Sequence, residues 1–236
     1  MKTIGLLGGM SWQSTASYYR AINQGIEKAL GGFHSAQIVL VSVDFHEIEL
    51  LQRRDDWETA GSLLACAAAQ AESAGADVLL ICTNTMHKVA SAIQESLTIP
   101  LLHIADATGL ALQADEISTV GLIGTRFTME QPFLKEKLAK EFGIQVLVPE
   151  RQHRDEVHDI IFHELVKGKV LETSKQRLLR IIETLNEQGA RAIILGCTEL
   201  AMLIDDTDTD IPVFDTTQIH AQAALDFALD ENVRHT

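Results

Sequence analysis

Two of the three cysteines follow apolar, strand-like runs, where a thiol could do chemistry. Residues 77–88 read DVLLICTNTMHK, so Cys82 closes a run rich in Val, Leu and Ile and precedes small polar residues. Residues 189–199 read GARAIILGCTE, so Cys197 follows a similar run. A thiolate can act as a nucleophile or as a base. Each cysteine is therefore either a reactive group at the mouth of a site or a buried residue of its strand.

Both segments belong to a longer internal repeat, in which strand-like stretches recur in the same order at nearly constant spacing. The matching pairs are 3–12 with 119–128, 75–85 with 189–199, and 99–106 with 211–218. The second pair aligns without a gap. This pattern predicts a duplicated α/β unit of roughly a hundred residues.

The alignment within the repeat makes a prediction about side-chain direction. It places Cys82 opposite Gly196 and Thr83 opposite Cys197. Side chains alternate along a strand, so neighbours at its end point to different sides. If Cys197 faces a site, we expect Thr83 to face one too and Cys82 to point away from it.

Helical patterns lie between these strands and must position their ends. The predicted helices cover residues 11–30, 57–75, 129–143 and 173–189, and a last helix covers 216–229. All but the last run to a glycine, as helix C-termini prefer. We expect the last helix to return and pack on the first half.

Strands that alternate with helices predict parallel sheets. We therefore expect an α/β fold of two pseudo-symmetric lobes, each a parallel sheet flanked by helices, with an active site between them. The first lobe is predicted to comprise residues 1–104 plus 215–236, and the second lobe residues 105–214. In such sheets ligands bind beyond the carboxyl ends of the strands.

Composition limits the partners of the chain. Its 236 residues carry a net charge of −14, which repels nucleic-acid phosphates and anionic lipid, so neither nucleic acid nor a membrane is an expected partner. No apolar stretch approaches the ~20 residues needed to span a bilayer. Three cysteines form an odd and small set, which suits free thiols in a reducing, cytoplasmic setting.

Four features together resemble the cofactor-independent aspartate/glutamate racemases: the duplicated architecture, GLLGGMSWQST at 5–15, TNTMH at 83–87 and GCTE at 196–199. The resemblance covers essentially the whole chain. It implies an amino-acid racemase, an isomerase of amino-acid metabolism that needs no pyridoxal phosphate or other cofactor. It also implies a small-molecule amino-acid substrate of the aspartate or glutamate type, and a homodimer.

Members of that family typically carry Cys-Asn-Thr in the first half and Gly-Cys-Thr in the second. Here the second motif is intact, but Thr83 stands where the first cysteine is expected. The resemblance implies that Cys197 removes the substrate's α-proton and that Thr83 is its opposite number, which returns a proton to the other face. A threonine hydroxyl is a far poorer base than a thiol, so we expect an enzyme that favours L-substrates.

The resemblance also implies which residues hold the substrate: Met10, Gln52, Asn84, Thr85 and Thr198. A basic residue for the second carboxylate of the substrate is left open between Arg53, Arg54 and Lys167. Both cysteine motifs lead into helix starts, whose N–H groups attract anions and lower the pKa of a thiol from its usual ~8.5.

Several residues have plainer interpretations. Cys66 lies in an Ala-rich helix and is expected in the core. Cys82 is expected to be buried and structural rather than catalytic. His153, His158 and His163 are spaced by five and share no helix face, so no metal site is predicted.

Two other functions fit the same residues. A decarboxylase or isomerase of the same superfamily could work with a single cysteine in its second half. A two-lobed protein that only binds amino acids would need no catalytic thiol. Exchange of the α-proton with solvent deuterium separates a racemase from both.

Overall fold

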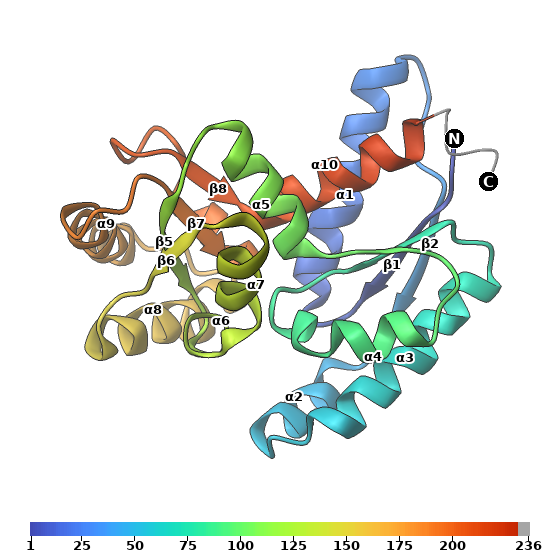
Figure 1. Cartoon of the computed structure of the whole chain (residues 1–236), viewed down its shortest axis with the longest axis horizontal. Coiled ribbons are helices and arrows are strands. Elements are labelled where there is room, and N and C mark those ends of the chain that lie inside the picture. Colours follow the sequence, from blue (N-terminus) through green and yellow to red (C-terminus); the bar gives the residue numbers. More distant parts are fainter. Residues whose placement is uncertain (231–236) are drawn as a thin grey trace. The chain divides into compact units, whose positions relative to one another are not determined.

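The structure is a computed structural model that describes residues 1–230, in which strands and helices alternate along the chain (Figure 1). The strands are β1 (Ile4–Gly8), β2 (Ile38–Ser42), β3 (Val78–Ile81), β4 (Leu101–Leu102), β5 (Thr119–Gly124), β6 (Gln145–Leu147), β7 (Ile193–Gly196) and β8 (Val213–Asp215). The α-helices are α1 (Trp12–Leu30), α2 (Phe45–Arg53), α3 (Trp57–Ser73), α4 (Ala90–Glu95), α5 (Ile104–Ala114), α6 (Arg126–Glu130), α7 (Pro132–Phe142), α8 (Arg151–His163), α9 (Glu172–Glu187) and α10 (Thr216–Leu229). Three short 3-10 helices are η1 (Thr85–Val89), η2 (Leu165–Lys167) and η3 (Thr198–Met202).

The chain divides into two compact units. Unit 1 comprises residues 1–104 and the chain from residue 220 onward, and unit 2 comprises residues 105–219. The division at its C-terminal side lies within α10, whereas the sequence placed it ahead of that helix, at residue 215. The last six residues of the predicted first lobe, 231–236, lie outside the described residues.

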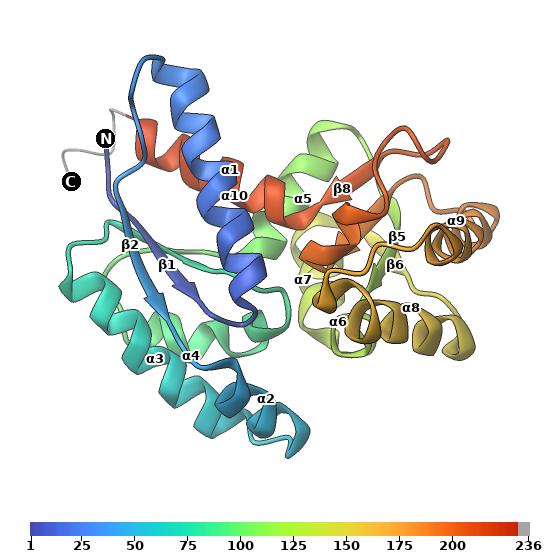
Figure 2. The same ribbon diagram turned by 180° about the vertical axis from the view of Figure 1, so that it is seen from behind.

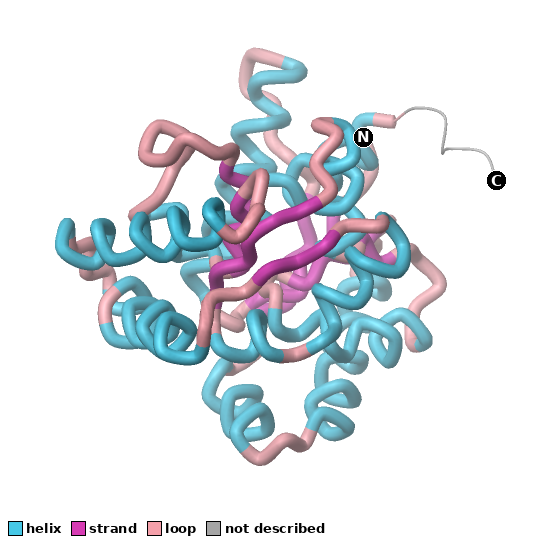
Figure 3. Tube along the Cα trace, turned by 60° about the vertical axis from the view of Figure 1, so that its left-hand side comes forward, coloured by secondary structure: helices cyan, strands magenta, loops and turns pink. Residues whose placement is uncertain are grey.

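Each unit contains one four-stranded parallel sheet, and the strand orders β2-β1-β3-β4 and β6-β5-β7-β8 correspond. Figure 3 shows the strands in magenta among the helices in cyan. The pairing registers correspond as well. Leu7 lies opposite Ile81 in unit 1, and the aligned residues Ile123 and Leu195 lie opposite each other in unit 2. The predicted α/β fold, with two similar parallel sheets flanked by helices, is confirmed.

In unit 1 the sheet is covered on both faces, as parallel sheets require. Helices α1 and α10 lie on one face of β1, and α3 and α4 lie on the other (Figure 2). The first face buries every second strand residue, among them Ile4 and Leu6, against Tyr18 of α1 and Ala224 of α10. The second face buries the residues between them, such as Leu7. The last helix therefore packs on the first half, as predicted.

Unit 2 repeats this three-layer arrangement. Ile123 and Ile193 pack with buried residues of α8 and α9 on one face. Leu122 and Ile194 pack on the other face with α5 and α7. Each strand thus alternates between two apolar layers, which fixes its register because a shift by one residue would exchange the two faces.

The glycine-rich turn after β1 leads directly into α1. Gly9 has φ +96°, a conformation that glycine adopts without steric cost, and a Cβ there would lie 2.1 Å from the carbonyl oxygen of Val43. The backbone N–H of Gly9 donates to the Thr15 hydroxyl at 2.8 Å. Ser11 then caps α1 by accepting a hydrogen bond from the N–H of Ser14.

The single helix predicted over residues 129–143 is wrong. The chain forms α6 and α7 instead, and the break lies at Gln131, whose φ of −70° and ψ of 147° are extended. Pro132 causes the break, because its ring disfavours helical geometry in the preceding residue while suiting the first position of the next helix.

The prediction that Cys66 is a core residue is also wrong, because its side chain is exposed. The buried positions of α3 are Ala60, Gly61, Leu64, Ala67, Ala68 and Ala71. Cys66 falls outside that stripe. In an Ala-rich helix, small residues occur on every face, so composition alone did not reveal the stripe.

None of the helices within residues 1–230 is both long enough and apolar enough to cross a membrane.

A buried histidine joins α10 to the rest of unit 1. Nε2 of His220 donates to the carbonyl of Leu102 at 2.8 Å, and Nδ1 accepts from the Tyr18 hydroxyl at 2.8 Å. Burial, assisted by the charge of the nearby His103, lowers the pKa of His220 from 6.5 to about 4. The folded protein therefore holds this side chain in its neutral form at neutral pH.

We expect this histidine to make the fold sensitive to acid. The pKa of His220 is lower in the folded chain than in the unfolded chain. Its contribution to the free energy of unfolding is therefore fully present above pH 6.5 and is lost as the pH drops to about 4. His220→Gln should flatten this dependence, as measured by urea unfolding across the window. The exposed control His34→Gln should leave it unchanged, and an equal pH dependence in both variants would contradict the assignment.

Candidate active site

The end of β7 presents Cys197 at the carboxyl edge of the unit 2 sheet. Cys197 is half-buried and packs on the same apolar layer as Ile193 and Leu195. Gly196 points to the opposite layer, where an added Cβ would lie 2.9 Å from a side-chain carbon of Thr128. The close packing behind Gly196 therefore turns the thiol of Cys197 toward the other face.

At the end of β3 in unit 1, successive side chains also point to opposite layers. Cys82 is fully buried with Val78 and Leu80, whereas Leu79 and Ile81 belong to the opposite layer. Thr83, the next residue, is half-buried. Burial raises the pKa of the Cys82 thiol far above its usual range, so it stays protonated. The prediction that Cys82 is buried is confirmed.

The thiol of Cys197 has a carboxylate partner that the sequence reasoning missed. Its Sγ donates to Oε2 of Glu199 at 3.0 Å, and the Glu199 side chain is buried. Burial of the thiol, together with the negative charge of Glu199, raises the pKa of Cys197 well above its usual value. We expected the helix start to lower this pKa instead. The short spacing was the available signal, since Glu199 follows Cys197 by two residues at the turn from the extended Cys197 into η3.

Thr83 is held in place through its backbone. His87 is buried, its Nδ1 donates to the carbonyl of Thr83 at 2.8 Å, and its Nε2 accepts from the N–H of Ile104 at 3.2 Å. Burial first, and then the charges of His103 and His220, lower the pKa of His87 well below 6.5. A neutral His87 with its proton on Nδ1 thus fixes the chain between Thr83 and η1.

The residues predicted to hold a substrate in unit 1 follow strands whose carboxyl ends meet at one edge of its sheet. Met10 follows β1, Asn84 and Thr85 follow β3, and Gln52 lies on α2, which follows β2; all four are buried. Nε2 of Gln52 donates to Sδ of Met86 at 2.9 Å, which ties α2 to η1. In unit 2, Thr198 is half-buried and begins η3 directly after Cys197.

The three basic candidates differ from this group because each is exposed. Arg53 pairs with Glu49 one helical turn earlier, Arg54 caps the end of α2, and Lys167 ends η2 in unit 2. Thr83 and Cys197 belong to different units, and their approach across a common cleft stays a prediction.

Among residues 1–230 there is no group of three or more His, Cys, Asp or Glu side chains arranged to hold a metal ion. The chemistry available at the two strand ends is that of a thiol, hydroxyls, amides and a buried carboxylate.

Comparisons with known proteins agree on one family. The sequence model of the family described as Asp/Glu/Hydantoin racemase matches residues 7–224. The broad specificity amino-acid racemase RacX of Bacillus subtilis is 24% identical over 230 residues, which cover 94% of this chain and 96% of RacX.

Two crystal structures are also similar along their whole length. A candidate Asp/Glu racemase from Yersinia pestis is 52% identical, with a TM-score of 0.93, and the match covers 98% of this chain and all of that one. An aspartate racemase homologue from Pyrococcus horikoshii is 32% identical, with a TM-score of 0.88 and the same coverage.

The pair of Cys197 and Glu199 makes a testable prediction about thiol reactivity. In a Cys66→Ala background, which removes the exposed thiol, Glu199→Gln should speed alkylation of Cys197 by iodoacetamide. Loss of the carboxylate charge lowers the pKa of the thiol, and one unit yields roughly tenfold more thiolate. Mass spectrometry of the labelled peptide measures the rate. The exposed control Glu150→Gln should not change it, and a slower or equal rate in Glu199→Gln would refute the coupling.

Proposed function

The chain belongs to the Asp/Glu/Hydantoin racemase family, and from this premise we propose that it inverts the α-carbon of aspartate- or glutamate-type amino acids without pyridoxal phosphate. The observation that carries the proposal is the half-buried thiol of Cys197 at a strand end, hydrogen bonded to a buried carboxylate. The α-hydrogen of an amino acid is a very weak acid. A desolvated thiolate aligned with that hydrogen is a base suited to its removal.

The raised pKa of Cys197 defines the first proton transfer. At rest the thiol carries its proton and donates it toward Glu199. When a substrate binds, Glu199 accepts this proton and the resulting thiolate takes the α-proton, so the thiol is restored and the substrate becomes an enolate-like anion. Glu199 is thus the positioning and proton-accepting partner of the base.

Reprotonation from the opposite face completes the inversion. We assign this step to the hydroxyl of Thr83 acting with a water molecule, which replaces the proton that Thr83 gives up. The proton that Glu199 accepted returns to solvent and neutralises the hydroxide that remains, so every group regains its resting state. The hydrogen bond from His87 fixes the Thr83 backbone and supports this role. Asn84, Thr85 and Thr198 supply donors for the α-carboxylate, and Met10 and Gln52 complete the binding site.

The unlike pair of bases makes the enzyme asymmetric. Cys197 is the stronger base and acts on the L-enantiomer, while Thr83 must take the α-proton in the reverse direction. The two enantiomers have equal free energies in water, so their equilibrium constant is one. The values of kcat/KM for the L-substrate and the D-substrate must therefore be equal. The asymmetry is therefore expected in kcat and KM taken singly, with higher kcat from L-substrates, and in proton exchange.

Deuterium exchange tests the assignment of Thr83 and Cys197. In deuterated water, L-aspartate or L-glutamate should gain α-deuterium faster than the D-enantiomer appears, because Cys197 returns a deuteron more readily than Thr83 supplies one. Thr83→Cys should bring the two rates together and raise kcat from the D-substrate. NMR loss of the α-proton signal and chiral chromatography measure the two rates.

The control for this experiment is Cys82→Ala, which alters a buried residue of the same strand end and should keep the asymmetry of the parent. Equal rates of exchange and inversion in the unaltered enzyme would disprove the unequal pair. Inversion that survives in Cys197→Ala would disprove the assignment of Cys197 as the base, and an unaltered enzyme that neither exchanges nor inverts the α-proton of these amino acids would disprove the proposed function.

We also infer a homodimer, as the resemblance to the family implies. In unit 1, the exposed side chains of Trp12, Tyr19 and Leu40 line a shallow cavity of about 790 Å³ along α1 and the edge strand β2. Apolar side chains gathered beside an unpaired strand edge suit contact with a second copy.

Light scattering of the purified chain should give twice the monomer mass, and Tyr19→Glu should give a monomer, since a buried charge opposes association. The control Leu110→Glu alters an exposed apolar residue of unit 2 and should leave the dimer intact. A monomeric parent protein would contradict the inference.

A further inference from the structure

A cavity of about 630 Å³ in unit 2 is lined by none of the residues that we assigned to catalysis or substrate binding. It lies beyond the carboxyl ends of β5 and β6, because α6 starts just after β5 and α8 starts shortly after β6. This volume falls within the range of ~300–1,000 Å³ that small-molecule sites occupy. The position matches the edge of a parallel sheet where ligands bind.

The cavity is positively charged, although the chain carries a net charge of −14. Four cationic side chains line it, namely Arg126, Lys135, Arg151 and Arg154, against two carboxylates, Glu130 and Asp155. Four cations less two anions leave a local excess of two positive charges. Such a concentration against the overall charge favours an anionic ligand.

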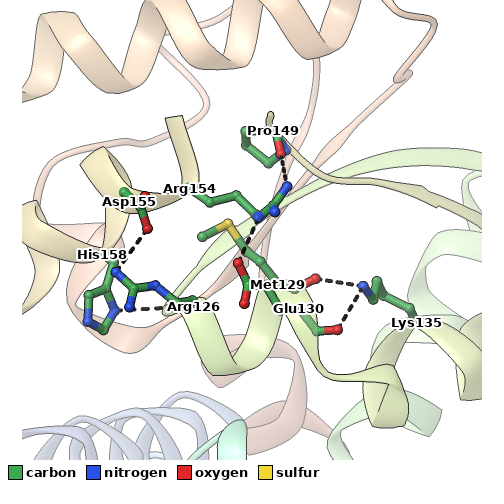
Figure 4. Close-up of polar contacts among 8 residues, drawn as sticks. All are labelled: Arg126, Met129, Glu130, Lys135, Pro149, Arg154, Asp155 and His158. Carbon is green, nitrogen blue, oxygen red and sulfur yellow. Dashed lines mark hydrogen bonds and ion pairs between the residues drawn. The ribbon is translucent and has the colours of Figure 1, made fainter. Parts of the chain in front are cut away.

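The two carboxylates orient the guanidinium groups but do not use all of their N–H donors (Figure 4). Nε of Arg154 pairs with Glu130 at 3.1 Å, and its Nη1 donates to the carbonyl of Pro149 at 2.8 Å. Nη2 of Arg126 pairs with Asp155 at 2.9 Å. Within residues 1–230, Nη2 of Arg154 and Nη1 and Nε of Arg126 make no hydrogen bond to protein, so each guanidinium keeps donors for a ligand.

Lys135 adds a third cation at a fixed place. Its Nζ donates to the carbonyls of Met129 at 2.7 Å and Glu130 at 3.3 Å, which holds the ammonium at the end of α6. Burial, and then the charge of Arg154, lower the pKa of Lys135. Two cations thus lie close together in a partly desolvated place, and a bound anion would relieve their repulsion.

The remaining walls are apolar, which argues against a bare inorganic ion. Met129 is fully buried and lies between the guanidinium groups of Arg126 and Arg154 in Figure 4, and Val148 is half-buried. An organic ligand could contact these side chains with its carbon atoms while its acidic groups meet the arginines. Guanidinium groups match the planar or tetrahedral oxyanions of carboxylates and phosphates.

We propose that this cavity binds a small organic dianion bearing carboxylate or phosphate groups, held by Arg126, Arg151, Arg154 and Lys135. The proposal concerns binding alone and goes beyond the reaction assigned to Cys197 and Thr83. The proposed ligand would be a second one for this chain, besides its amino-acid substrate, and would carry more negative charge.

Calorimetric titration of the full chain tests the proposal, with glycerol 3-phosphate and succinate as the two organic probes and inorganic phosphate as a third. At least one organic probe should bind, and raising the salt concentration should weaken its binding. Arg126→Gln and Arg151→Gln should each weaken it at least tenfold, which is about 1.4 kcal/mol. Arg151 makes no ion pair within the described chain, so its replacement leaves the fold intact.

The matched control is Arg177→Gln, which removes an arginine of the same unit that pairs with Glu156 outside the cavity lining. It should bind the probe as tightly as the parent, and so should Cys197→Ala, which separates this site from the reaction. Failure of both organic probes to bind, equal affinity for inorganic phosphate, unchanged binding in Arg126→Gln and Arg151→Gln, or loss of binding in Cys197→Ala would each overturn the proposal.

Discussion

The burial of both faces of each parallel sheet is the constraint from which the candidate site follows. Strand residues alternate between two filled apolar layers, so the side chain at each strand end has only two directions available. At β7 the layer behind Gly196 has no space for even a methyl group. At β3 the equivalent layer contains Cys82. The following residues, Cys197 and Thr83, are the first at each strand end that are only half-buried.

Protonation states at the two strand ends are fixed by neighbours rather than by solvent. His87 must remain neutral to donate to Thr83 and accept from Ile104 at once. Cys197 keeps its proton because a desolvated thiolate beside the charge of Glu199 would be doubly unfavourable. A thiol stored in this form resists oxidation, since oxidants attack the thiolate.

Much of this arrangement could be predicted from the sequence, because the internal repeat reports on both halves. The gap-free alignment of 75–85 with 189–199 predicted the duplicated α/β unit and the buried position of Cys82, and the alternation of strands with helices predicted the parallel sheets. Patterns within one element were less informative. In the Ala-rich α3, small residues surround the helix, so the exposure of Cys66 depended on which stripe packs.

Features that depend on two distant segments could not be predicted. The bond from Gln52 to Met86 joins α2 to η1, and the basic cavity joins residues that follow β5 to others that follow β6. Neither the hydrogen bond nor the cavity corresponds to a periodic pattern or a fixed residue spacing in the sequence. Glu199 was easier to identify, since it follows Cys197 by two residues, but its role required knowing that the chain passes from the extended Cys197 directly into η3.

The return of α10 to unit 1 has a consequence for protein synthesis. Residues 1–104 leave the ribosome first, yet the sheet face that receives Ala221 and Ala224 stays bare until the C-terminal segment has been translated. Unit 2 is continuous along the chain and can close its core before that moment. The half that starts to fold first therefore finishes last, and a nascent chain exposes an apolar strip that chaperones would recognise.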